Sequence, residues 1–89
     1  MNEKSQSDKD LVFSNCKIKK SYVHFIKKEI KNHPQAKTIL LDGNKFYDEG
    51  LLIIIGSLMY SKINFIDLSN NNLTEKSLNA LKQLCLKNK

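Results

Sequence analysis

The sequence predicts a single α/β domain made of three copies of one strand–helix unit. Three observations lead to this prediction. A short motif of alternating apolar residues recurs every 27 or 28 positions, a helical apolar pattern follows each copy, and 89 residues leave room for only one domain. We expect a short parallel sheet with one strand per copy, covered on one side by the helices.

The predicted strand segments share four spaced positions, of which the third is polar or a cysteine. Residues two apart on a strand point to the same face, so the first two positions point inward. The third position lies in a turn whose buried backbone groups need hydrogen-bond partners. Asn44 and Asn71 suit that task and would form a buried structural ladder, with Cys16 as a weaker substitute. The three copies are Leu11, Phe13, Cys16 and Ile18; Ile39, Leu41, Asn44 and Phe46; and Ile66, Leu68, Asn71 and Leu73.

The predicted helices span about 20–32, 48–60 and 75–87. Apolar residues recur in each with the i, i+3, i+7 spacing of a helix face that packs on a core. These stripes are Val23, Ile26 and Ile30; Leu51, Ile54 and Leu58; and Leu78, Leu81 and Cys85. We therefore place the repeats at about 8–35, 36–62 and 63–89, after a disordered tail over residues 1–7.

The pattern L-x-L-x-x-(N/C)-x-L followed by a helix resembles the leucine-rich repeat. Residues 63–73 carry the closest match, whereas Asp8 and Ala36 hold the leading apolar slot in the other two copies. The repeat length and the helical second half are most similar to the ribonuclease-inhibitor-like subclass, and the chain is also similar to small bacterial leucine-rich-repeat effectors. The resemblance implies a three-repeat solenoid that binds another protein through its concave sheet and rim loops.

The outward-facing strand residues are the candidate binding residues, because the fold itself does not require them. Alignment of the copies places them in columns across the sheet, where neighbouring strands lie about 4.8 Å apart. The apolar centre consists of Val12, Leu40 and Phe65, and the carboxylates of aspartates surround it. Such a surface is typical of an interaction site, although apolar residues also stabilise a sheet by pairing across strands. The columns are Asp10, Thr38 and Phe65; Val12, Leu40 and Asp67; and Ser14, Asp42 and Ser69. Lys17, Lys45, Tyr47 and Thr74 follow on the rim, where Tyr47 is a candidate anchor.

Lysine supplies all fifteen positive charges of the chain, whose net charge is +6. Without arginine, the chain lacks the side chain best suited to bidentate recognition of guanine or phosphate, so we expect no nucleic-acid partner. Many of the lysines fall on the predicted helices, opposite the sheet. A Lys-rich surface that binds nucleic acid or anionic membrane without specificity is the alternative, as is a self-associating solenoid fragment.

The sequence shows no convincing catalytic or metal-binding constellation. Cys16 with His24 or His33 could form a nucleophile and its base, but Cys16 falls in the ladder slot. Together with Cys85, these residues match no short-range zinc-ligand spacing. Asp48 and Glu49 begin a helix, where negative charge stabilises the N-terminus. We expect no enzyme, no metal and no cofactor.

Targeting signals are also not evident. The apolar run 51–55 is too short to span a membrane, and residues 1–7 have no apolar signal region. Two cysteines are too few for a disulfide framework, which indicates a cytoplasmic protein. A chain rich in Lys, Asn and Ile and free of Arg is typical of AT-rich genomes, which favours an intracellular bacterium.

We therefore expect a protein-binding module whose partner is another protein, either an enzyme or an effector. Inhibition by capping an active site is one mechanism that the resemblance implies. Delivery into a host cell by a bacterial secretion system is one setting in which such a module would act.

Overall fold

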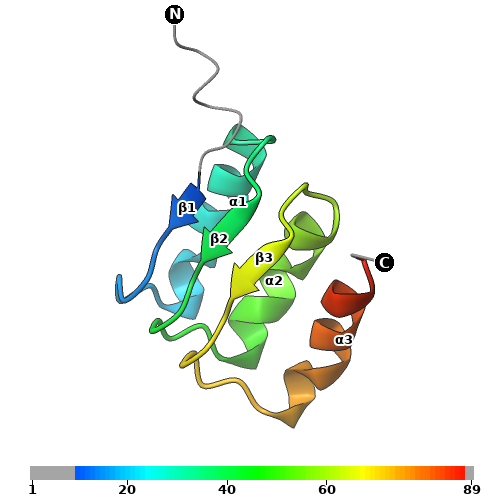
Figure 1. Cartoon of the computed structure of the whole chain (residues 1–89). Helices are drawn as coiled ribbons and strands as arrows, with labels where there is room; N and C mark the ends of the chain where they lie inside the picture. The colour runs from blue at the N-terminus through cyan, green and yellow to red at the C-terminus, as the bar shows by residue number, and fades with distance from the viewer. Residues whose placement is uncertain (1–9, 88–89) are drawn as a thin grey trace, which may run out of the picture.

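Three short strands, β1 (Asp10–Val12), β2 (Thr38–Leu40) and β3 (Phe65–Asp67), form a parallel sheet in the order β1-β2-β3. The structure is a computed structural model that describes residues 10–87, so the predicted tail over residues 1–7 lies outside the described residues. A helix follows each strand, and the helices form a second layer on one side of the sheet (Figure 1). The predicted α/β class and parallel sheet are therefore confirmed.

The helices occupy the ranges that the apolar spacing predicts. A 3-10 turn, η2 (Lys20–Tyr22), leads into α1 (Val23–Asn32), and α2 (Tyr47–Met59) begins directly. The last helix has the same form as the first, with η3 (Glu75–Ser77) before α3 (Leu78–Leu86). We call each strand with its following helix a unit, so the described chain consists of three consecutive units.

The hydrophobic core lies between the sheet and the helices. It is most complete in the middle unit, where Ile39, Leu41 and Phe46 have no exposed surface. Their counterparts in the third unit, Ile66, Leu68 and Leu73, are only partly buried. This difference follows from position, because the middle unit has a neighbour on both sides. The buried apolar residues of the helices are Val23, Ile26, Ile30, Leu51, Ile54, Leu58 and Leu84.

The predicted apolar stripe of the third helix is wrong by one residue. Leu78 and Cys85 are exposed, whereas Ser77 and Leu84 are buried. The rotation follows from Ser77, whose hydroxyl bonds to the Asp48 carboxylate and holds this residue inward. Leu84 lies seven residues later, two turns along the same helix face, and Leu78 and Cys85 therefore face solvent.

The side chain of Asn44 forms hydrogen bonds with backbone groups in the turn of the first unit. The side-chain oxygen of Asn44 accepts the backbone amides of Cys16, at 3.0 Å, and Ile18, at 2.9 Å. Its side-chain amide donates to the carbonyls of Phe13, at 2.9 Å, and Leu41, at 2.8 Å. Buried backbone groups that would otherwise lack partners are thereby satisfied.

Asn71 repeats this arrangement one unit later. Its oxygen accepts the amide of Phe46 at 3.3 Å, and its amide donates to Leu41 at 2.8 Å and Leu68 at 3.1 Å. Each of the two asparagines therefore bonds both to its own turn and to the turn of the preceding unit.

Cys16 does not fill the role expected of it as a buried ladder residue. Its side chain is exposed, and among the described residues its thiol has one hydrogen-bond partner, the carbonyl oxygen of Ser14 at 3.5 Å. The reason is its place in the first unit, since no earlier turn within residues 10–87 lies beside Cys16 and presents backbone groups to it.

Gly43 holds the turn of the middle unit close to that of the first. Its φ of +72° lies in the left-handed region that favours glycine. A Cβ atom at this position would lie 1.9 Å from the Oδ1 atom of Asn15. The close approach of the two turns therefore requires the absence of a side chain here.

Candidate functional site

The outer face of the sheet carries the candidate binding residues in the predicted columns. The register pairs Asp10 with Thr38 and Thr38 with Phe65 in one column. The other column joins Val12, Leu40 and Asp67, and we call these two columns the sheet face. Because side chains alternate along a strand, the sheet face points away from the core that Leu11, Ile39 and Ile66 face.

Apolar side chains on the sheet face are open to solvent. Val12 is 58% exposed and Phe65 57% exposed, while Leu40 between them is partly buried. Leu11, Ile39 and Ile66 lie on the inner side of the same strands and pack the sheet against the helices. The outer apolar residues are therefore available for contact with another molecule.

Asp67 and Asp42 are both fixed by hydrogen bonds at the carboxyl end of the strands. The Asp67 carboxylate accepts the backbone amide of Ser69 at 3.1 Å and its hydroxyl at 2.7 Å. These bonds hold the pKa of Asp67 below its ordinary value, so the group is an anion at neutral pH. The hydroxyl of Ser14 donates to Asp42 at 2.6 Å. Within the third predicted column Ser14 therefore bonds to Asp42, whereas Ser69 bonds to Asp67 of the second column.

Lys45 and Tyr47 lie beyond the sheet on the rim, as their sequence positions suggest. Lys45 is exposed and forms an isolated parallel bridge with Lys19. Tyr47 is 42% exposed and begins α2 with a φ of +59°, while its backbone amide donates to the carbonyl of Asn71 at 2.9 Å. The rim is therefore basic and aromatic, next to a face that carries carboxylates.

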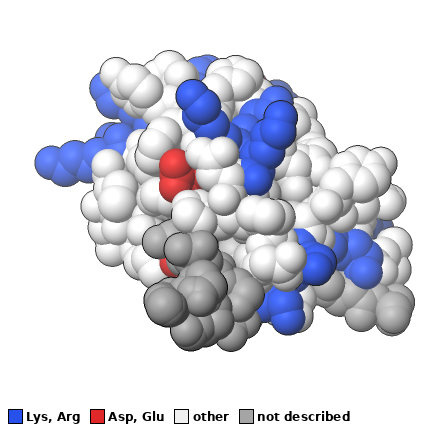
Figure 2. All heavy atoms as spheres, turned by 90° about the horizontal axis from the view of Figure 1, so that it is seen from above, with Lys and Arg blue, Asp and Glu red and all other residues white. Residues whose placement is uncertain are grey.

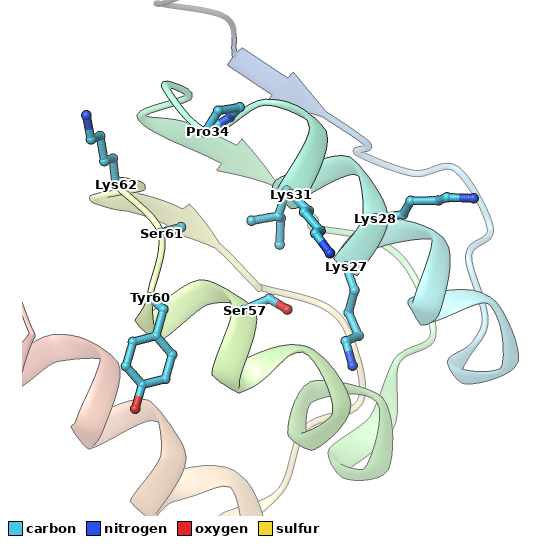
Figure 3. A pocket seen from close by; sticks show the side chains of 9 residues that line it. Lys27, Lys28, Lys31, Pro34, Ser57, Tyr60, Ser61 and Lys62 are labelled. Carbon is cyan, nitrogen blue, oxygen red and sulfur yellow. The ribbon is translucent and has the colours of Figure 1, made fainter.

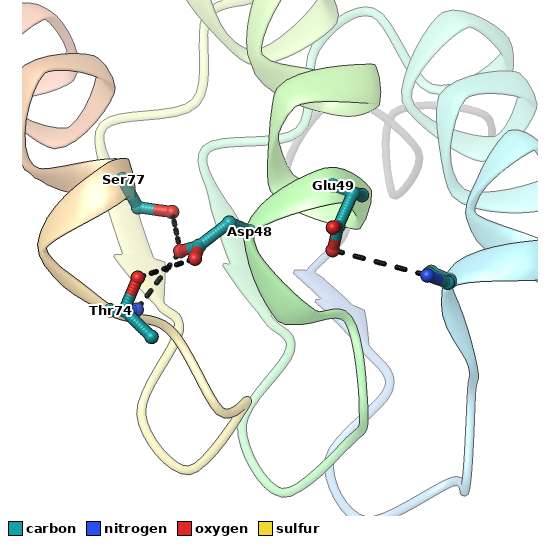
Figure 4. A network of polar contacts seen from close by, with 5 residues as sticks. Asp48, Glu49, Thr74 and Ser77 are labelled. Carbon is teal, nitrogen blue, oxygen red and sulfur yellow. Dashed lines mark hydrogen bonds and ion pairs between the residues drawn. The ribbon is translucent and has the colours of Figure 1, made fainter.

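Asp48 has a role that the sequence analysis did not identify. Its carboxylate accepts the backbone amide of Thr74 at 2.9 Å and the hydroxyls of Thr74 and Ser77 (Figure 4). These bonds hold the pKa of Asp48 below its ordinary value, and the Ser77 hydroxyl makes the largest contribution. Glu49 forms an ion pair with Lys20 at 4.0 Å. The two acidic residues at the start of α2 therefore connect the middle unit to both of its neighbours.

Lys87 is a second residue whose role the sequence did not reveal. Its Nζ donates to the carbonyls of Leu58, Ser61 and Ile63, at 2.6, 3.1 and 3.1 Å. These carbonyls lie at the end of α2 and in the loop that follows it. Burial of the ammonium group lowers the pKa of Lys87. No pattern near residue 87 could have predicted this contact, because its acceptors come from a distant part of the chain.

A groove lined by lysines runs between α1 and α2 on the helical side, with a volume of about 680 Å³. Lys27 and Lys31 extend from α1 into the gap between the helices, with Ser57 of α2 nearby (Figure 3). Its described lining contains no carboxylate. Most of the charged side chains visible in Figure 2 are also lysines. The other lining residues are Lys28, Ile30, Pro34, Tyr60, Ser61 and Lys62.

The residues considered for catalysis do not come together. Cys16, His24 and Cys85 are all exposed, and the Nε2 atom of His33 lies 3.6 Å from the Glu29 carboxylate on the same helix. Within residues 10–87, no group of three or more His, Cys, Asp or Glu is placed to hold a metal ion. No helix in the described part of the chain has both the length and the apolar character that a membrane crossing requires.

A comparison with protein families adds one independent finding. Residues 62–84 match the model of a family described as Leucine Rich Repeat. This match covers the third unit, in which the motif was most regular. Leucine-rich repeats generally mediate protein–protein interaction and are typically non-enzymatic. A search of curated proteins and a search of solved structures both found no match.

Proposed function

We propose that this chain is a protein-binding module that engages a partner protein through the sheet face and the adjacent rim. The observation that carries the proposal is the exposure of Val12 and Phe65 on either side of Leu40. These side chains contribute to no core packing, and the leucine-rich repeat matched by the third unit typically serves as a binding module.

The charges around the sheet face define the partner further. Asp67 and Asp42 provide fixed carboxylates at one end of the apolar centre, and Asp10 provides another at the opposite end. A protruding segment with apolar side chains flanked by basic residues would complement this surface. Tyr47 on the rim supplies an aromatic anchor, a residue type common in the hot spots of interfaces.

Our proposal includes a finer description of the protein. We infer a three-repeat leucine-rich-repeat solenoid of the ribonuclease-inhibitor-like type, because a helix follows the strand in every unit. The partner would be an enzyme or an effector whose active site the module caps. A cytoplasmic location, and a bacterial effector delivered into a host cell, are hypotheses that depend on composition alone.

The lysine-lined groove supports a second candidate function, the binding of an anionic surface. Lys27 and Lys31 extend into this groove, and no carboxylate lines it among the described residues. Nucleic acid or anionic lipid would be attracted by such a surface. Attraction of this kind falls steeply with added salt, whereas contacts with an apolar centre change little.

Site-specific photo-crosslinking tests the main proposal. A photoreactive phenylalanine analogue replaces Phe65 in one version of the chain and Leu52 in another, because Leu52 is a similarly exposed residue of α2 at 53%. We expect crosslinks to the partner from position 65 and not from position 52. Equal yields, or crosslinks from position 52 alone, would contradict binding by the sheet face.

A substitution experiment complements the crosslinking. The variant Val12→Asp with Phe65→Asp should lose the partner, and Leu52→Asp should retain it. Circular dichroism confirms that each variant is folded. If capture of the same partner disappears in Lys27→Gln with Lys31→Gln instead, the second candidate function replaces the first.

A further inference from the structure

The third unit ends the sheet with backbone donors that the earlier units use for stacking. Between consecutive units, two amides of one turn donate to two carbonyls of the next. Leu68 and Asn70 hold the corresponding amides in the third unit, and neither has an acceptor within residues 10–87. The observed pairs are Phe13 with Leu40 and Asn15 with Asp42, both at 2.8 Å, then Leu41 with Asp67 at 2.9 Å and Gly43 with Ser69 at 3.0 Å.

The first unit carries the complementary acceptors on the opposite edge of the sheet. Val12 and Ser14 are the residues of the first unit that correspond to Leu40 and Asp42. Their carbonyls point away from β2, because strand groups alternate between the two neighbours of a strand. β1 and β3 form the two edges of the sheet (Figure 1). One end of the stack therefore offers acceptors, and the other offers donors with the same spacing.

Apolar side chains accompany both edges. Leu78 and Leu86 of α3 are each 56% exposed, and with Leu81, Lys82 and Cys85 they line a hollow of about 610 Å³. We call these residues and the β3 edge the third-unit face. The hollow exists because Leu78 and Cys85 face outward from α3 and not into the core. These residues lie on the flank of α3 that corresponds to the flank of α1 turned toward α2.

The opposite end of the stack is aromatic. Tyr22 is 63% exposed and Phe25 50% exposed, and the Phe25 ring packs edge-on against Phe13 with centroids 5.9 Å apart. We call these residues and the β1 edge the first-unit face. Lys27, on the other flank of α1, faces α2 across the lysine-lined groove. The aromatic flank therefore faces away from the second unit.

One pair of charged positions across the two faces is also complementary. At the interface between the second and third units, Asp48 accepts bonds from Thr74. Glu75 holds the place of Asp48 one unit later, and Lys19, the residue before η2, holds the place of Thr74 in the first unit. Stacking of the third-unit face on a first-unit face would bring the Glu75 carboxylate near the Lys19 ammonium group.

We propose that the third-unit face binds the first-unit face of a second copy of this chain, so that copies stack head to tail. The parallel sheet then continues from β3 of one copy to β1 of the next, with Leu68 and Asn70 donating to Val12 and Ser14. Such a contact uses two different surfaces, so each added copy leaves one of each face open. The proposal does not depend on the sheet face having a partner.

Sedimentation velocity of the full 89-residue chain over a range of concentrations tests this proposal. Reducing buffer prevents disulfides between the exposed Cys16 and Cys85. One variant, Leu78→Asp with Leu86→Asp, blocks the third-unit face. Another, Tyr22→Asp with Phe25→Asp, blocks the first-unit face. Leu52→Asp is the matched control on the helix of the middle unit, and circular dichroism confirms folding.

We expect the wild-type chain and the control to form a concentration-dependent series of oligomers, and each blocked variant to be a monomer alone. An equal mixture of the two blocked variants should form a dimer and nothing larger, because each supplies one intact face. The single substitution Leu86→Asp, in the last turn of α3, replaces the double variant if that does not fold. A wild-type chain that stays monomeric at its solubility limit, or a blocked variant that still self-associates, would overturn the proposal.

Discussion

The Asp48 carboxylate accepts both the backbone amide and the hydroxyl of Thr74, and so joins the start of one helix to the start of the next (Figure 4). An acidic residue at this position stabilises its own helix N-terminus and also orders the 3-10 turn that begins the following unit. Ser77, the buried residue at the end of that turn, bonds to the same carboxylate. A single side chain thereby sets the rotation of α3.

Stability at acid pH depends on this carboxylate. Its hydrogen bonds hold the pKa of Asp48 below the ordinary value of 3.8, so its contribution is complete above that value and is lost as the pH falls through the lowered pKa. We expect Asp48→Asn to melt at a lower temperature at neutral pH and to lose less stability on acidification than the wild type. Thermal melts from pH 7 to pH 2 measure both effects. Parallel curves for the two proteins would show that Asp48 is not the group responsible.

Asn44 should be the most sensitive polar residue in the protein. Replacement by alanine leaves the backbone amides of Cys16 and Ile18 and the carbonyl of Phe13 without this partner, while the Leu41 carbonyl keeps its bond to Asn71. We expect Asn44→Ala to cost about 3 kcal/mol of unfolding free energy, since each unsatisfied buried group is expensive. Urea denaturation measures the loss. Asn79→Ala, at an exposed position of α3, is the control and should be close to neutral.

Two glycines should respond to alanine in opposite directions. Gly43→Ala forces a Cβ against Asn15 at a positive φ, and we expect it to cost about 1–2 kcal/mol. Gly56→Ala adds a methyl group to an exposed position of α2 with no atom within 4 Å, and it should stabilise by about 0.5–1 kcal/mol. The same denaturation experiment compares both variants with wild type. Destabilisation by Gly56→Ala would indicate a contact at this site that the structure does not show.

Lys87 should contribute more to stability than other lysines. Its ammonium group donates to three carbonyls at the end of α2 and in the loop that follows it, and we expect Lys87→Met to cost about 1–2 kcal/mol. Methionine retains most of the aliphatic packing, so the loss reports on the hydrogen bonds. Lys82→Met, on the exposed side of α3, should change the melting temperature little.

Much of the fold followed from the spacing of apolar residues. The period of 27 or 28 residues predicted three strands in register, and the structure pairs Asp10 with Thr38 and Thr38 with Phe65 in the predicted column. Helical spacing predicted the helix ranges, although the first three residues of the first and third ranges form 3-10 turns and not α-helix. These features depend on local geometry and on a pattern that repeats, both of which are visible in a single sequence.

Features that depend on contacts between units were not predictable in the same way. The rotation of α3 depends on the Ser77 hydroxyl bonding to Asp48 of the preceding unit, and apolar spacing alone does not distinguish the two possible buried faces of this helix. Cys16 occupies the right position in the motif but has no preceding turn to bond within the described residues. Asp48 looked like an ordinary acidic residue at a helix start, because its partners Thr74 and Ser77 belong to a distant segment.

The asparagine bonds give the chain a direction. Asn44 and Asn71 each accept hydrogen bonds from backbone amides of the unit before them. Each of the first two units therefore depends on the unit that follows it. Loss of the third unit would leave the amide of Phe46 without its acceptor, whereas loss of the first would leave the Asn44 oxygen with no donor at all. When the molecule is pulled from its two ends, the first and third units should therefore detach at different forces. The rate of amide hydrogen exchange should likewise differ between these two end units.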